Sequence, residues 1–290
     1  MLRFTLVLAF VLQATGAALQ FDSSRAWEHL RQLVSIGPRP SGSPAIEQAR
    51  TYIKGQLAKS GLTAVEQKWV ADTPAGKIAM LNLIATIPGA RKERIVVAGH
   101  YDTKRFDRFR FVGASDGASS AAFVIELGRV LKARRNPFTI ELLFLDGEEA
   151  VREVWAGTDN TYGSRHYVDA ASRDGSLAGL KALVLLDMIG DRDLKIRRDT
   201  LSTPWLTDLV WSAAREKKLD EYFVPATTEV EDDHVPFLKA GVPAVDIIDL
   251  DYGAWHTAGD TLDAVSARSL QIVGDVVLAA LPQVEARLGR

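Results

Sequence analysis

The stretch "FTIELLFLDGEEAV" (residues 138–151) joins a buried strand to a pair of carboxylates. Residues 138–145 form a short, mostly apolar run that ends at an Asp-Gly turn, which is typical of an interior strand of a parallel sheet. Two adjacent glutamates, Glu148 and Glu149, follow the turn. Because consecutive side chains point in different directions, the two carboxylates can take different roles at the end of that strand.

Strand and helix patterns alternate on both sides of this stretch. Aliphatic and β-branched runs separated by amphipathic helices predict an α/β fold, with three layers (α/β/α) around a mixed, mostly parallel sheet. No repeat, long charge block or Pro/Gly linker divides residues 22–290, so we expect a single domain. The expected strands are 63–71, 79–87, 94–99, 138–145, 180–189 and 243–250, and the expected helices are 22–37, 44–61, 119–135, 204–219 and 266–288.

The composition is that of a soluble globular protein. Of the 290 residues, 47% are hydrophobic and 25% charged, the net charge is -2 and the pI is about 6.2. This balance argues against a nucleic-acid partner. There is no cysteine, which excludes a thiolate zinc site, a catalytic thiol and a lipid-modified N-terminal cysteine. Any metal must therefore be held by His, Asp and Glu.

The N-terminus "MLRFTLVLAFVLQATGAALQ" has the pattern of a secretory signal. One arginine precedes an apolar run at 4–12, and small residues follow at 14–18. The run is too short to span a bilayer, and no later segment is apolar enough to do so. We expect a signal peptide at residues 1–18 and an exported, periplasmic or secreted protein without stable membrane association. The alternative is a hydrophobic N-terminal helix or an uncleaved anchor.

Acidic and imidazole side chains gather where the predicted strands end. In open α/β sheets, ligands bind at the carboxyl ends of the strands. So many unpaired carboxylates would repel one another, and a divalent cation is the simplest compensation. Oxygen and imidazole donors suit a catalytic zinc, which needs three protein ligands and one open position. The residues concerned are His100, Asp102, Asp116, Glu148, Glu149, Asp187, Asp232, Asp233, His234, Asp246, Asp249 and His256.

Each of these residues also has an ordinary structural explanation. Asp116 and Asp232 could cap helices, and His100 could be a hydrogen-bonded core histidine. Glu148 and Glu149 could begin a solvated helical turn. The number of polar residues that converge on one sheet edge favours a site over these separate explanations.

Seven motifs occur in an order that resembles the zinc aminopeptidase-like fold of the M28 metallopeptidases. Within that family, the chain is most similar to the animal-type glutaminyl cyclases, over about residues 25–288. The motifs are "GHYD" (99–102), "GASDGAS" (113–119), "LDGEEA" (145–150), "YGSRH" (162–166), "LLDMIG" (185–190), "DDHVPFLKAGVPAVDI" (232–247) and "WHTAGDT" (255–261).

The resemblance implies a ligand set and a proton carrier. It assigns one zinc ion to Asp116, Glu149 and His256, and it makes Glu148 the proton shuttle. The implied reaction is cyclisation of the N-terminal glutamine of peptides to pyroglutamate, with release of ammonia. We also expect a monomer, and the missing cysteines favour a bacterial source because animal counterparts usually carry a disulfide.

The remaining roles concern the proton network and the substrate pocket. Asp187 and Asp232 would form an acidic pair beside the proton shuttle, and Trp155 and Trp255 would line the pocket. Asp246 is a departure, because the animal cyclases have a histidine there; we assign it to substrate binding.

Two rival functions remain open at the level of sequence. The first is a two-zinc aminopeptidase, in which His100 and Asp187 would bind the second ion. The second is a metal-free binding domain, which the presence of every candidate ligand disfavours.

Overall fold

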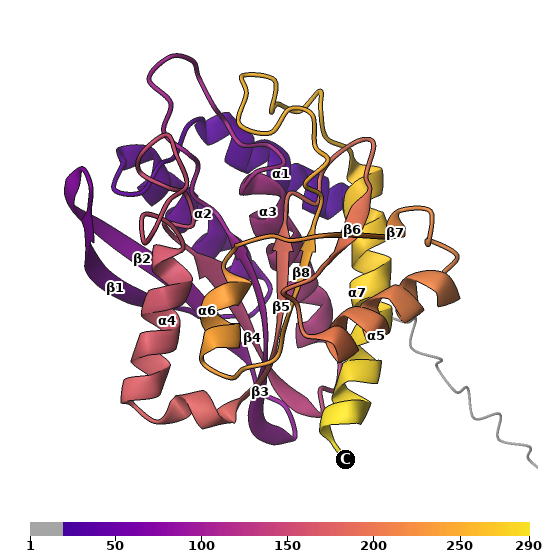
Figure 1. Cartoon of the computed structure of the whole chain (residues 1–290). Coiled ribbons are helices and arrows are strands. Elements are labelled where there is room, and N and C mark those ends of the chain that lie inside the picture. Colours follow the sequence, from indigo (N-terminus) through magenta and orange to yellow (C-terminus); the bar gives the residue numbers. More distant parts are fainter. Residues whose placement is uncertain (1–19) are drawn as a thin grey trace, which may run out of the picture.

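The computed structural model describes residues 20–290, and a six-stranded sheet forms its centre (Figure 1). The strands are β1 (Ala64–Thr73), β2 (Gly76–Ile87), β3 (Arg91–His100), β4 (Phe138–Leu145), β5 (Leu180–Asp187), β6 (Ile196–Asp199), β7 (Phe223–Thr228) and β8 (Ala244–Ile248). The order in the sheet is β1-β2-β4-β3-β5-β8, while β6 and β7 form a separate parallel pair. β1, β2 and β4 pair antiparallel, and β4, β3, β5 and β8 pair in parallel. The expected mixed, mostly parallel sheet is therefore confirmed.

Helices cover both faces of the sheet, which gives the expected three layers (Figure 1). Side chains alternate along β3, so Ile95 and Val97 face the larger core, whereas Val96 and Ala98 face the smaller one. On the larger core lie α1 (Ser23–Ile36), α2 (Pro44–Lys59), α3 (Ala118–Lys132), α5 (Pro204–Glu216) and α7 (Ala267–Leu288). On the smaller core lie α4 (Tyr162–Arg173) and α6 (His234–Lys239).

All the expected strands and helices are present, and four further α-helices and strands, together with a short 3-10 helix at Ser176–Gly179, were not expected. The helix α4 follows Thr161, which has φ 45° and makes no side-chain cap, so the usual start signal is absent. The other three, β6, β7 and α6, have only four to six residues each, too few to show a clear period. The expected signal peptide lies outside the described residues. Within residues 20–290, no helix is long and apolar enough to cross a membrane.

A buried ion pair holds the end of β4 against the helix α2. Asp146, the residue after β4, is fully buried and pairs with Arg50. The Asp146 carboxylate also accepts hydrogen bonds from Ser41 Oγ at 2.6 Å and from the Leu81 amide at 2.8 Å. Arg50 Nε donates in turn to the Tyr101 hydroxyl at 2.8 Å. This network fixes the turn that carries the two adjacent glutamates.

Replacing Arg50 by Ala should destabilise the protein far more than removing an exposed arginine. The change leaves the buried Asp146 carboxylate without its partner, and such a loss costs about 3–5 kcal/mol. The measurement is denaturant unfolding at pH 8. Burial and the charge of Asp102 raise the pKa of Asp146 to about 6 against the effect of Arg50, so the carboxylate is ionised at pH 8.

The matched control is Arg31→Ala, which removes a half-exposed pair with Glu28 and should cost less than about 1 kcal/mol. Equal losses for the two variants would mean that the Arg50–Asp146 pair does not hold this turn.

Candidate active site

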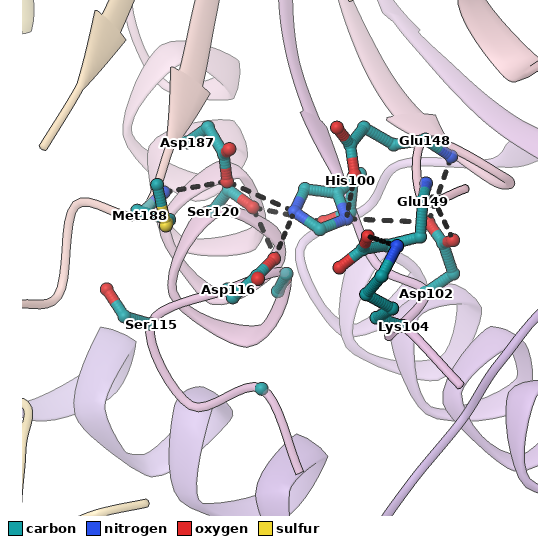
Figure 2. A network of polar contacts seen from close by, with 12 residues as sticks. His100, Asp102, Lys104, Ser115, Asp116, Ser120, Glu148, Glu149, Asp187 and Met188 are labelled. Carbon is teal, nitrogen blue, oxygen red and sulfur yellow. Dashed lines mark hydrogen bonds and ion pairs between the residues drawn. The ribbon is translucent and has the colours of Figure 1, made fainter. Parts of the chain in front are cut away.

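The carboxyl ends of β3, β4 and β5 bring the candidate residues together (Figure 2). His100 ends β3, the two glutamates follow β4, and Asp187 ends β5. Asp116 joins them from the turn before α3, and His256 from the loop after β8. All of them are buried except His256, which is partly exposed. The convergence expected from the sequence is therefore what the structure shows.

One group of three residues has the geometry of a metal site. His256 Nε2 lies 3.3 Å from Asp116 Oδ2 and 3.2 Å from Glu149 Oε1. A tetrahedral zinc ion with bonds of about 2.0–2.1 Å would separate its ligand atoms by roughly 3.3 Å. Asp116 Oδ2 is buried and has no hydrogen-bond partner among residues 20–290. These donors fit a catalytic metal, and the expected trio lies together.

Asp116 does not cap the helix that follows it. The N-cap of α3 is Gly117, at φ 90°, and no side chain caps the helix. A Cβ at Gly117 would lie 2.4 Å from the Asp102 carbonyl oxygen, so only glycine fits there. The Asp260 carboxylate accepts hydrogen bonds from the backbone amides of Ser115, at 2.8 Å, and Asp116, at 3.2 Å. This clamp leaves the Asp116 side chain free to face the site.

Asp102 fixes the directions of the two adjacent glutamates. Each of its two carboxylate oxygens accepts one hydrogen bond from a backbone amide, that of Glu148 at 3.3 Å and that of Glu149 at 3.4 Å. Glu149 then faces His256, whereas Glu148 Oε2 lies 3.7 Å from His100 Nδ1. Lys104 Nζ approaches Glu149 Oε2 from the other side, at 3.5 Å. The sequence-based expectation that the two carboxylates diverge is confirmed.

The environment of Glu148 suits proton transfer. Burial raises the pKa of Glu148 well above its usual range against the effect of His100, and the charges of Glu149 and Asp232 add to the rise. Asp232 has its pKa raised to about 7 by burial and by the charge of Asp187. A carboxyl with a raised pKa can both take up and release a proton near neutral pH.

A second group of possible ligands shares Asp116 with the first. His100 Nε2 lies 3.0 Å from Asp187 Oδ1 and 3.2 Å from Asp116 Oδ1. Dashed lines in Figure 2 mark both contacts. Burial lowers the pKa of His100, but the charges of Asp187 and Glu148 outweigh it, and the pKa lies well above 6.5. Met188, the residue after Asp187, has φ 46°, and His256 has φ 52°. Positive φ at two such residues is the backbone strain that clusters at functional sites.

A cavity of about 320 Å³ opens onto these residues. Trp155 and Trp255 both line it, as expected from the sequence, and the ring of Trp255 stacks on His256 with centroids 4.4 Å apart. The sequence did not single out Phe106, whose ring packs edge to face with His256 at 5.6 Å between centroids, as the ring of Phe111 does at 5.9 Å. The aromatic residues at 106, 109 and 111 in "KRFDRFRF" (104–111) were the available signal.

Asp246 does not line this cavity, and its expected substrate-binding role stays a prediction. It is fully buried, and its amide donates to Ser202 Oγ at 2.9 Å. Side chains of β8 that share its face reach the cavity only further along the chain, at Ile248 and Leu250. The carboxyl lies 3.7 Å from His234 Nδ1, and burial and the charge of Asp232 raise its pKa well above the usual range. Asp246 is therefore a buried neighbour of the acidic pair.

Comparison with known proteins places the chain in a family. Residues 82–281 match the model of peptidase family M28. A glutaminyl-peptide cyclotransferase-like protein of Mus musculus is 32% identical over 83% of this chain and 70% of its own length.

Two solved structures are similar over nearly the whole chain. An Acidobacteriales bacterium glutaminyl cyclase is 42% identical, with a TM-score of 0.90, over 94% of this chain and 98% of the other. A Fimbriiglobus ruber glutaminyl cyclase is 29% identical, with a TM-score of 0.83, over 91% of this chain and 95% of the other. These similarities extend over the strands and loops that carry the site. The chain belongs to peptidase family M28 and, within it, to the glutaminyl cyclases.

Proposed function

We propose that this protein cyclises the N-terminal glutamine of peptides to pyroglutamate and releases ammonia, with one zinc ion bound by Asp116, Glu149 and His256. The observation that carries the proposal is the placement of Glu148. It is buried, its pKa is raised, and it lines the same cavity as the ligand trio. Membership of the glutaminyl cyclases supports this function.

The bound zinc would act as a Lewis acid toward the γ-carbonyl of the substrate glutamine. Glu148 takes a proton from the α-amine as the new carbon–nitrogen bond closes the five-membered ring. It then delivers that proton to the amide nitrogen, which leaves as ammonia when its bond to the γ-carbon breaks. General acid–base catalysis of this kind contributes about 10²–10⁴-fold.

The cavity walls support the same reaction. Trp155 and Trp255 provide flat apolar surfaces that suit a small side chain and exclude water. The amine and the carbonyl belong to one residue, so holding that residue in a folded conformation brings the reacting atoms together. Asp187 and Asp232 supply the negative charge that keeps the proton affinity of Glu148 high.

The alternative function is a two-metal aminopeptidase. The second ligand group, formed by His100, Asp116 and Asp187, is the observation that favours it. A metal-to-protein ratio near two, together with release of N-terminal leucine, would support this alternative.

Export and a monomeric state are also proposals. The apolar run and small residues of the first 18 positions support export. N-terminal sequencing of protein from the bacterial periplasm or medium tests cleavage near residue 18, and size-exclusion chromatography tests the monomer.

The zinc-loaded protein should convert a peptide that begins Gln-Ala and leave one that begins Leu-Ala intact. Mass spectrometry would then show loss of one ammonia from the first peptide, faster than in a protein-free control. Release of free leucine without faster cyclisation would instead establish the aminopeptidase.

Glu148→Gln should lower kcat by about 10²–10⁴-fold, because the amide cannot carry the proton. Zinc content and thermal stability should stay close to those of the unchanged protein. Near-normal turnover in this variant would remove Glu148 from the mechanism.

Glu149→Ala should instead reduce the zinc content of the purified protein, because it deletes one of three ligands. The neighbouring Glu148→Gln variant is the matched control, since it changes an adjacent carboxylate that lies outside the trio. Full zinc occupancy in Glu149→Ala would show that the trio is misassigned.

A further inference from the structure

The carboxylates around the cavity fall into an inner set and an outer set. The inner ones are buried and belong to the site described above. The outer ones, Glu153, Glu229 and Glu231, are exposed and line the mouth of the same cavity. The reaction does not use these three.

Only one of the outer glutamates has its charge opposed. Glu153 pairs with Arg108, and both side chains are largely exposed. Glu229 and Glu231 form no ion pair with any residue in the range 20–290. Two unopposed negative charges therefore remain on one side of the mouth.

Packing fixes these two glutamates in place. Val230, which lies between them, is buried against Met188, Ile248 and Tyr252. Its amide also donates to Asp199 Oδ1 at 3.1 Å. Val230 is buried while the residues on both sides of it are exposed, so Glu229 and Glu231 both face outward.

The inner end of the cavity indicates where a ligand lies. Asp232 follows this segment directly, and its Oδ2 atom is buried without a hydrogen-bond partner among the described residues. The same holds for Asp116 Oδ2. These orphaned oxygens mark the deep end, which the first residue of a substrate must reach for its side chain to react. The residues that follow must then lie at the mouth.

We propose that Glu229 and Glu231 form a subsite that selects peptides with lysine or arginine directly after the N-terminal glutamine. The inference rests on the proposed function, because that function sets the direction in which the peptide enters. Each exposed charge pair contributes a small factor, so two together should favour a basic over an acidic second residue by about three- to tenfold in kcat/KM. The preference should fall in about 1 M salt, where the screening length is about 3 Å.

The test compares kcat/KM for Gln-Lys-Ala, Gln-Ala-Ala and Gln-Glu-Ala at low and high salt. The readout is the ratio between the lysine and glutamate peptides. In the double variant Glu229→Gln/Glu231→Gln this ratio should fall toward one. The control is Glu221→Gln, which makes the same type of substitution, with loss of one negative charge, at an exposed position outside the cavity and should keep the ratio.

A ratio near one in the unchanged protein, or an unchanged ratio in the double variant, would overturn the subsite. Binding of the same peptides to the Glu148→Gln variant, followed by calorimetry, gives a second measurement that needs no turnover. If no peptide is cyclised, the proposed function fails. Tighter binding of the lysine peptide to Glu148→Gln, lost when Glu229→Gln and Glu231→Gln are added to that variant, would still support the subsite. Equal affinities for the lysine and glutamate peptides would overturn it.

Discussion

Mutual repulsion between buried carboxylates is the constraint on which the rest of the site depends. Five buried carboxyl groups lie together at one cavity: Asp116, Glu148, Glu149, Asp187 and Asp232. Like charges in such surroundings hold protons that they would otherwise lose, and they attract cations. The raised pKa values of Glu148, His100 and His256 and the proximity of the ligand trio all follow from this crowding.

The fold keeps these groups together because the strands that deliver them are anchored elsewhere. The β4 end is held by the ion pair of Asp146 and Arg50, which is outside the metal trio. The directions of the glutamates are set by hydrogen bonds from their backbone amides to Asp102. The positions of the reacting groups therefore depend on hydrogen bonds to the backbone rather than on contacts among the acids themselves.

Much of this could be read from the sequence. The strand 138–145 has the expected bounds, because its apolar run ends sharply at the Asp-Gly turn. The residue types at the parallel strand ends indicated a group of possible metal ligands, and the family resemblance selected Asp116, Glu149 and His256 from it. The depth of Asp246 and the packing of Phe106 on His256 could not be predicted, because both depend on contacts between segments far apart in the chain. The burial of Val230 between its exposed neighbours has the same cause.

The small β6–β7 pair is separate from the main sheet. The carboxylate of Asp199, at the end of β6, accepts hydrogen bonds from the backbone amides of Ser202 and Val230. The floor of the cavity thus comes from the central sheet, while part of its mouth comes from this appended unit. A change in the appended unit can alter the entrance without moving the ligands on the floor. Descendants of such a protein could diversify in the peptides they accept while the chemistry stays the same.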